Sequence, residues 1–283
     1  MILSNSGLCP SRGPAKPAGS SSRQRGFRVL CAAVCFAASV SQSDAGLKIY
    51  YLRHAEAGNN VVKQWEEVRK NERPGYVGNS REFTPKGEEQ VAAVPKKLQQ
   101  YHFNFIAVSP TWRTRHTILP YLKATSGTGE IWPELHEFGG GFMVFSTNLP
   151  APIGPILNAG SRVQLPSEEA PYFRLRADGQ REFKVTAQRQ SEHDAGVRFV
   201  VQRVIDMIRR RFGGTDKSIL LVGHSNSGKC LLRMLTNNKE AGRPGITNAG
   251  IWMVEQQADG QFKLKIYNDA PYDPSQAASA PSR

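Results

Sequence analysis

The chain has 283 residues, of which 39% are hydrophobic and 22% are charged, as in an ordinary soluble globular protein. Its net charge is +13, and it is still +9 without residues 1–45, which contain five basic residues and one acidic residue. Such a basic chain favours an anionic partner. A phosphate-bearing or otherwise anionic partner is expected, and nucleic acid is not, because no basic run is interleaved with aromatic residues.

Residues 1–45 are predicted to be a targeting segment. Basic residues up to Arg28 precede the apolar run 29–40, and small residues follow at Ser43 and Ala45. The apolar run is shorter than the roughly 20 residues that cross a bilayer, so no stable membrane span is expected. We expect a signal peptide and a secreted or periplasmic protein. The alternatives are an organellar transit peptide, or a cytoplasmic protein whose start is mis-assigned.

From residue 47 onward, short apolar runs alternate with segments of helical periodicity. The run 218–222 (SILLV) is continuously apolar, which is typical of a buried parallel strand. The predicted elements are a strand at 47–52, a helix that begins at Thr84-Pro85, a strand at 103–108, helices at 114–123 and 197–212, and the strand at 218–222.

The last apolar segments, 250–255 and 261–267, are separated by a loop that ends in Asp259-Gly260, which predicts a hairpin. Its second strand alternates lysines with apolar residues, as an exposed edge strand does. The whole pattern predicts an α/β fold, a three-layer sandwich with a mostly parallel central sheet, helices on both faces and a terminal hairpin edge strand.

Residues 138–190 interrupt this alternation. They are rich in glycine and proline and show no sustained period, so we expect an irregular lid insertion. The folded domain is predicted to span 46–270, and 271–283 to be a flexible tail. Since Cys230 is the only cysteine of the domain, neither an internal disulfide nor a cysteine-based metal site is expected.

Two histidines follow predicted strands directly: His54 and His224. The carboxyl ends of parallel strands line one crevice, so both imidazoles are expected there, with Arg53 and Arg113. Glu137 follows another apolar stretch. Arginines bind phosphate oxygens, a neutral imidazole can attack phosphorus, and a carboxylic acid can protonate the leaving oxygen. The set therefore predicts phosphoryl transfer.

Five segments, in this order, resemble motifs of the histidine phosphatase superfamily, which includes the cofactor-dependent phosphoglycerate mutases. They are Leu-Arg-His-Ala-Glu (52–56) with Asn60 beyond it, Phe-Thr-Pro-Lys-Gly-Glu-Glu-Gln (83–90), Ser-Pro-Thr-Trp-Arg-Thr-Arg-His-Thr (109–117), Leu-His-Glu (135–137) and Gly-His-Ser-Asn-Ser-Gly-Lys (223–229). The third segment selects Arg113 over Arg115.

This resemblance implies a phosphomonoesterase that acts on a small phosphorylated substrate, needs neither metal nor cofactor and forms a phosphohistidine on His54. His224 would assist, and Glu137 would be the acid, with Glu134 as its competitor. The implied phosphate-binding residues are Arg53, Asn60, Arg113, His224 and Ser225. The alternatives are a phosphoglycerate mutase-like transfer and a catalytically silent phosphate-binding module.

Two other motifs overlap the second histidine. The glycines and lysine of 223–229 match the first part of a P-loop, but Cys230 stands where the magnesium-binding hydroxyl is needed. The same residues approach a nucleophile elbow, which would need a histidine after Ser225, and none follows. The remaining histidines, including His116 and His136, are interpreted as surface or packing residues.

Overall fold

The computed structural model of the protein describes residues 46–138, 157–185, 190–239 and 245–273. Its main sheet has eight strands in the order β10-β9-β8-β1-β7-β2-β3-β5, and β4 and β6 form a separate pair. The strands are β1 (Lys48–Arg53), β2 (Phe105–Val108), β3 (Gly129–Ile131), β4 (Leu157–Arg162), β5 (Phe173–Leu175), β6 (Arg181–Val185), β7 (Ser218–Gly223), β8 (Ile251–Gln256), β9 (Phe262–Tyr267) and β10 (Ala270–Pro271).

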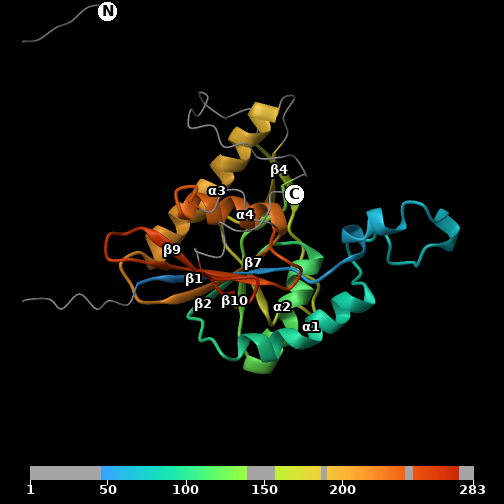
Figure 1. Cartoon of the computed structure of the whole chain (residues 1–283), viewed down its shortest axis with the longest axis horizontal. Helices are drawn as coiled ribbons and strands as arrows, with labels where there is room; N and C mark the ends of the chain where they lie inside the picture. The colour runs from blue at the N-terminus through green and yellow to red at the C-terminus, as the bar shows by residue number, and fades with distance from the viewer. Residues whose placement is uncertain (1–45, 139–156, 186–189, 240–244, 274–283) are drawn as a thin grey trace, which may run out of the picture. The chain divides into compact units, whose positions relative to one another are not determined.

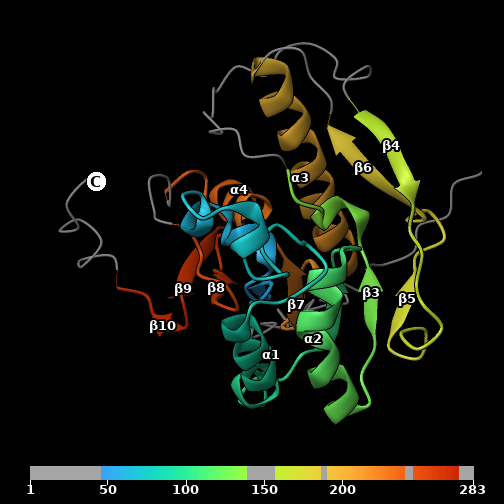
Figure 2. The same cartoon turned by 90° about the vertical axis from the view of Figure 1, so that its right-hand side faces the viewer.

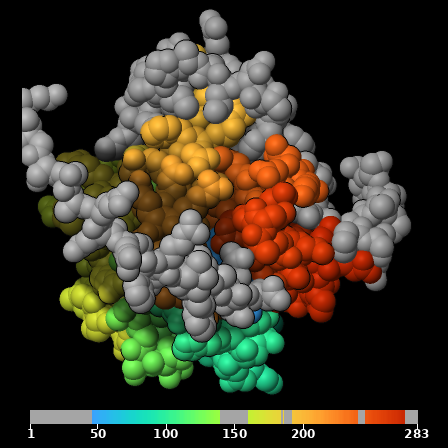
Figure 3. Space-filling model, turned by 90° about the vertical axis from the view of Figure 1, so that its left-hand side faces the viewer, coloured from blue at the N-terminus to red at the C-terminus, as the bar shows by residue number. Residues whose placement is uncertain are grey.

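Helices cover both faces of this sheet (Figure 1). The long helices are α1 (Pro85–Leu98), α2 (Trp112–Thr125), α3 (Gln190–Phe212) and α4 (Ser225–Leu235), and short 3-10 turns lie at Gly58–Asn60, Val62–Trp65, Lys70–Glu72 and Pro133–Leu135. In Figure 1, α3 and α4 lie above the sheet, and α1 and α2 lie below it. Figure 3 shows α3 and α4 next to each other at the surface, beside the β8–β9 segment.

Two apolar cores hold these layers together. Val204 and Ile208 of α3 belong to a core on one face of the sheet, and Val94 and Leu98 of α1 belong to a core on the other. β1 supplies both, because Tyr51 lies in the first and Leu52 in the second. This alternation is expected of a strand whose side chains point to opposite faces in turn.

The sequence prediction of a mostly parallel α/β sandwich is confirmed. β1, β7, β2, β3 and β5 run parallel to their neighbours, and β8 and β9 add an antiparallel hairpin beside β1. The hairpin lies at this end of the sheet, as expected, but β9 is not the outermost strand, because the two residues of β10 pair with Ile266 and Tyr267.

The start of α1 also follows the sequence. Thr84 caps the helix, its hydroxyl accepting from the backbone N–H of Gly87 at 3.0 Å, and Pro85 occupies the first turn. A proline fits there because the first amides of a helix have no intrahelical acceptor.

The prediction of an irregular insertion over 138–190 is wrong for residues 157–185. β5 pairs with β3 in the main sheet, and Phe173 packs into the core, while β4 and β6 pair with each other near α3 (Figure 2). These strands have three to six residues, and Pro166 and Pro171 lie between β4 and β5, so the strands are too short to produce a recognisable period. The lid itself stays a prediction, since residues 139–156 and 186–189 lie outside the described ranges.

The predicted targeting segment and all but the first three residues of the predicted tail also lie outside the described residues. Among the helices in the described part of the chain, none combines the length and apolar character needed to cross a bilayer.

Candidate active site

The predicted site residues come together at the carboxyl ends of three neighbouring strands. Arg53 ends β1 and His54 follows it, His224 follows β7, and Arg113 lies in the first turn of α2, shortly after β2. Because β1, β7 and β2 are adjacent and parallel, these segments leave the sheet at the same edge. The His54 and His224 ring centroids are 5.1 Å apart.

His54 is buried and held in one tautomer. Its Nδ1 lies 2.7 Å from the carbonyl oxygen of Ala55, which can only accept, so Nδ1 carries the proton. Its Nε2 accepts a hydrogen bond from Nε of Arg113 at 3.1 Å. Burial, and then the nearby positive charge of Arg113, hold the pKa of His54 well below its usual value. The ring is therefore neutral at physiological pH, with an unprotonated Nε2.

Arg113 also contacts the second histidine. Its Nη2 lies 3.1 Å from Nδ1 of His224, and because a guanidinium only donates, Nδ1 is the acceptor. The proton of His224 is then on Nε2, which lies 2.9 Å from Oγ of Ser109. Burial, followed by the charge of Arg113, lowers the pKa of His224 well below its usual value. One guanidinium thus bridges two neutral imidazoles.

Arg53 has one donor that is hydrogen-bonded and one buried donor that is not. Its Nη1 donates to the carbonyl oxygen of Ile246 at 2.6 Å. Its Nε is buried and has no hydrogen-bond partner among the described residues. A buried donor without a partner is costly unless a ligand satisfies it.

Asn60 is connected to the backbone of His54 through Asn248. Its Oδ1 accepts from the backbone N–H of Ala57 at 3.0 Å and from Nδ2 of Asn248 at 3.4 Å. Asn248 also donates to the carbonyl oxygen of His54 at 3.1 Å. Sequence reasoning missed Asn248, which lies in a loop without a recognised motif. The contact of Asn60 with the phosphate stays a prediction.

Glu137 reaches the start of α4. Its Oε1 accepts from the backbone N–H groups of Phe138 and Ser227 at 3.0 and 3.2 Å, and Asn226 N–H lies 3.4 Å from Oε2. The positive end of a helix favours a carboxylate at this place. Burial nevertheless raises the pKa of Glu137 above its usual value, although the three backbone donors lower it.

Glu134, the competing acid, is occupied elsewhere. It forms a two-pronged ion pair with Arg176, whose nitrogens lie 2.8 and 3.1 Å from the two carboxylate oxygens. Arg203 approaches the same carboxylate at 3.6 Å. These partners belong to the insertion and to α3, so the geometry favours Glu137 beside the histidines.

Tyr51 fixes the loop between β7 and α4. Its hydroxyl accepts from the backbone N–H of His224 at 2.7 Å and lies 3.0 Å from both the carbonyl oxygen of His224 and Oγ of Ser227. A Cβ atom on Gly223 or Gly228 would come within 2.1 or 2.4 Å of the Tyr51 side chain. The two glycines that imitate a P-loop therefore make room for this tyrosine.

Ser225 is the first residue of α4 and is partly exposed at the helix start. Its position makes its backbone N–H one of the amides that no intrahelical carbonyl satisfies. Phosphate binding by Ser225 stays a prediction.

Arg115, which the third motif leaves aside, has a different environment. Its Nε and Nη2 pair with the carboxylate of Glu169 at 2.5 and 3.2 Å, and it also contacts the Pro110 carbonyl. His116 lies 3.1 Å from the same carboxylate. These contacts hold the pKa of Glu169 down at about 2. Arg115 thus ties α2 to the insertion.

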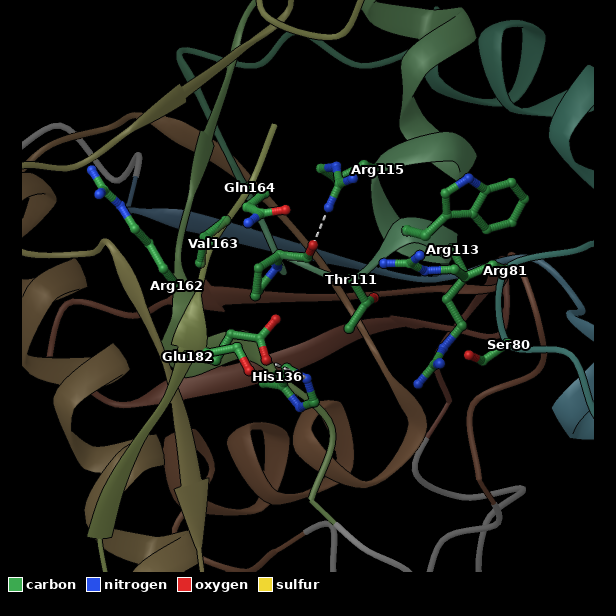
Figure 4. A pocket seen from close by; sticks show the side chains of 13 residues that line it. Ser80, Arg81, Thr111, Arg113, Arg115, His136, Arg162, Val163, Gln164 and Glu182 are labelled. Carbon is green, nitrogen blue, oxygen red and sulfur yellow. Dashed lines mark hydrogen bonds and ion pairs between the residues drawn. The ribbon is translucent and has the colours of Figure 1, made fainter. Parts of the chain in front are cut away.

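A cavity of about 490 Å³ opens beside Arg113 (Figure 4). Its walls come from the segment before α1, the start of α2 and the end of β4 with β6. His136, interpreted above as a surface or packing residue, lines it, and its ring lies 6.0 Å from that of His224. Within the described ranges, no group of three or more histidine, cysteine or acidic side chains is arranged to hold a metal ion.

Two neutral histidines and two arginines thus lie at the carboxyl edge of the central parallel strands, where ligands bind in such sheets, and arginines are suited to anionic ligands such as phosphate. Residues 49–144 match the profile of the histidine phosphatase superfamily (branch 1). This match agrees with the resemblance that the sequence motifs predicted. The matched segment contains His54, Arg113 and Glu137 and ends before His224.

Three solved structures illustrate what the chain is similar to. YhfR of Bacillus stearothermophilus is 16% identical, with a TM-score of 0.49, over 79% of this chain and 98% of that one. The ecdysone phosphate phosphatase of Bombix mori, in complex with tungstate, is 14% identical, with a TM-score of 0.47, over 83% and 96%. The alpha-ribazole phosphatase of Shigella flexneri is 16% identical, with a TM-score of 0.46, over 78% and 96%. No curated protein sequence matches the chain significantly.

Proposed function

We propose that the protein is a phosphomonoesterase that transfers the phosphoryl group of its substrate to Nε2 of His54 and then to water. The observation that carries this proposal is the tautomer of His54. The Ala55 carbonyl keeps the proton on Nδ1, so Nε2 carries the lone pair and directs it at Arg113, one of the residues that line the cavity. The low pKa of His54 keeps that nitrogen unprotonated.

The phosphoryl group would bind among Arg53, Arg113 and His224. Arg53 offers a buried Nε that has no partner in the described part of the chain. Arg113 would exchange its hydrogen bonds to the two histidines for bonds to phosphate oxygens, which are the stronger acceptors because they are charged. That exchange releases Nε2 of His54 for attack.

In the first step, Nε2 of His54 attacks phosphorus and the ester P–O bond breaks. The leaving alkoxide takes a proton from Glu137, whose pKa is raised by burial, which favours the protonated acid. The products of this step are an alcohol and a phosphohistidine, with Glu137 ionised. The anionic oxygens stay paired with Arg53 and Arg113.

In the second step, water attacks the phosphohistidine and the P–N bond breaks. Glu137 takes the proton of the water, which restores the acid, and inorganic phosphate leaves. The sum of both steps is hydrolysis of one phosphomonoester. No step draws on a metal ion, because the two guanidinium groups supply the positive charge that the phosphoryl oxygens need.

The test is hydrolysis of p-nitrophenyl phosphate by the purified protein in the presence of a chelator. His54→Ala removes the nucleophile and should lower kcat at least about a thousandfold, whereas exposed His102→Ala, the matched control, should keep it. Rapid quenching with a ³²P-labelled substrate should trap the label in acid-labile form on the wild-type protein. Activity that survives in His54→Ala would refute the mechanism.

Two further readouts separate the alternatives. Glu137→Gln should slow alkyl phosphates far more than p-nitrophenyl phosphate, whose leaving group needs no proton; equal slowing would assign the acid to another residue. Release of inorganic phosphate identifies hydrolysis, whereas movement of the label to another hydroxyl of the same substrate would identify a mutase.

Export of the chain is part of the proposal and rests on the signal-like sequence of residues 1–45. Amino-terminal sequencing of the protein recovered from its native host should begin near residue 46. A protein that retains the first 45 residues would refute export by cleavage.

A further inference from the structure

Arg113, which is proposed to bind the transferred phosphoryl group, also lines the cavity, so the rest of a bound phosphomonoester can extend into it. The cavity volume of about 490 Å³ suits a small molecule. Polar side chains dominate its walls, and Figure 4 shows Arg81 and Ser80 on one side and Gln164 and Glu182 on the other. Such a lining selects a polar alcohol over a large apolar one.

The cavity carries more positive than negative charge. Of its four arginines, Arg115 is neutralised by Glu169, and Arg113 donates to the two catalytic histidines. Arg162 and Arg81 have no carboxylate partner in the described part of the chain. The one acidic residue of the lining, Glu182, lies 3.7 Å from Nε2 of His136.

The two unneutralised arginines differ in what their guanidinium groups contact. Nη2 of Arg162 lies 3.5 Å from the Gln180 side-chain oxygen, and in Figure 4 the Arg162 side chain points away from the other lining residues. The guanidinium of Arg81 forms neither a hydrogen bond nor an ion pair with any described residue. Arg81 is therefore the cation that the cavity leaves open to a ligand.

The loop that carries Arg81 is anchored. Asn79 Oδ1 accepts from the backbone N–H of Arg81 at 2.9 Å. The side-chain amide of Asn79 also donates to the carboxylate of Glu82 at 3.1 Å, so the acidic residue that follows Arg81 in the chain is paired with Asn79. The carbonyl of Glu82 accepts from the backbone N–H of Gly58 at 2.9 Å, and a Cβ on Gly58 would collide with the Tyr76 carbonyl. The backbone thus holds Arg81 at the cavity wall.

We infer that Arg81 binds a second anionic group of the substrate, a carboxylate or a second phosphate, while Arg113 binds the phosphoryl group that is transferred. This inference rests on the proposed function and names its substrate class: a small phosphorylated organic acid or a bisphosphate. A guanidinium pairs with either group through the same forked geometry.

The test compares four substrates with the full-length protein. 2-Phosphoglycolate carries a carboxylate, fructose 1,6-bisphosphate carries a second phosphate, glucose 6-phosphate carries neither, and p-nitrophenyl phosphate reports the chemical step. The wild type should prefer one of the doubly charged substrates over glucose 6-phosphate in kcat/KM. The preferred one identifies the second group as carboxylate or phosphate.

Arg81→Gln should reduce that preference by about tenfold to a hundredfold, mainly through KM, as expected for loss of a hydrogen bond between charged groups. Arg162→Gln is the matched control, since it removes the same charge from the same cavity; it should change the preference less than threefold. An equal loss in both variants would show long-range attraction instead of a site. An unchanged preference in Arg81→Gln would overturn the inference.

Binding separates this inference from the proposed function. Calorimetric titration of His54→Ala with 2-phosphoglycolate and with fructose 1,6-bisphosphate measures the subsite without turnover. Adding Arg81→Gln to that variant should weaken binding at least tenfold for whichever of the two ligands binds more tightly. If p-nitrophenyl phosphate is not hydrolysed but this loss is seen, the catalytic proposal fails and the subsite stands. If binding is unaffected, the subsite fails whatever the activity.

Discussion

Replacing Tyr51 by phenylalanine removes one hydroxyl that serves three buried groups. The backbone N–H of His224 donates to it at 2.7 Å, and it lies 3.0 Å from both the His224 carbonyl oxygen and Oγ of Ser227. The ring keeps its stacking on Trp252, with centroids 5.0 Å apart and planes inclined by 6°. The substitution therefore tests the hydrogen bonds and leaves the packing intact.

The expected loss of stability follows from the groups left without a partner. The N–H of His224 has no other acceptor among the described residues, and an unsatisfied buried donor costs about 1–3 kcal/mol. Ser227 can rotate its hydroxyl to another acceptor, which limits its share. We expect the free energy of unfolding to fall by about 2–3 kcal/mol, within the range for one buried hydrogen-bonded group.

Urea unfolding followed by circular dichroism measures this change, provided that the dependence on urea concentration stays equal in both proteins. Tyr50→Phe is the matched control. Tyr50 is the preceding residue, faces the opposite core, and its hydroxyl forms no hydrogen bond within the described ranges. It should lose less than about 0.5 kcal/mol, as substitutions without a lost contact do. A Tyr51→Phe loss as small as that of Tyr50→Phe would refute the reasoning.

Two further predictions concern pH. The proposed mechanism requires neutral His54 and protonated Glu137. The value of kcat/KM should therefore fall with decreasing pH only well below 6.5, and it should fall with increasing pH above the usual carboxyl range. A loss of activity that begins at pH 6.5 or above as the pH is lowered would contradict the neutral histidine. Glu169→Gln should destabilise the protein by about 3–5 kcal/mol at pH 7, because it leaves Arg115 buried without its carboxylate. The pKa of Glu169 is about 2 in the folded protein, so its stabilising contribution should be complete above about pH 5 and be lost as the pH falls toward 2. Urea midpoints between pH 5 and 3 measure that loss, which should be absent in the variant.

The sequence predicted the elements that carry long apolar runs or clear start signals. The run 218–222 became β7, and Thr84-Pro85 starts α1. The placement of His54 and His224 followed from the same reasoning, because a residue just past a parallel strand lies at a known edge of the sheet.

What the sequence could not predict depends on contacts through space. Asn248 bonds to the backbone of His54 from a position far along the chain, and no local pattern marks it. In the sequence, Tyr51 is one more apolar residue of a strand. Only the structure shows that Gly223 and Gly228 make room for its side chain. The short strands of 157–185 form only because each has a partner: β5 pairs with β3, and β4 pairs with β6.

The pairing of β1 with β7 has a consequence for how the protein acquires activity. Tyr51 and His224, which bond at the centre of the site, are 173 positions apart in the chain. Closing so long a loop carries a large entropic cost, and parallel pairing between distant segments forms slowly. During synthesis His54 emerges early, yet it has no partner histidine until nearly four fifths of the chain has been made. A nascent or half-folded chain therefore lacks the pair of histidines, and the candidate site exists only once β1 and β7 have paired.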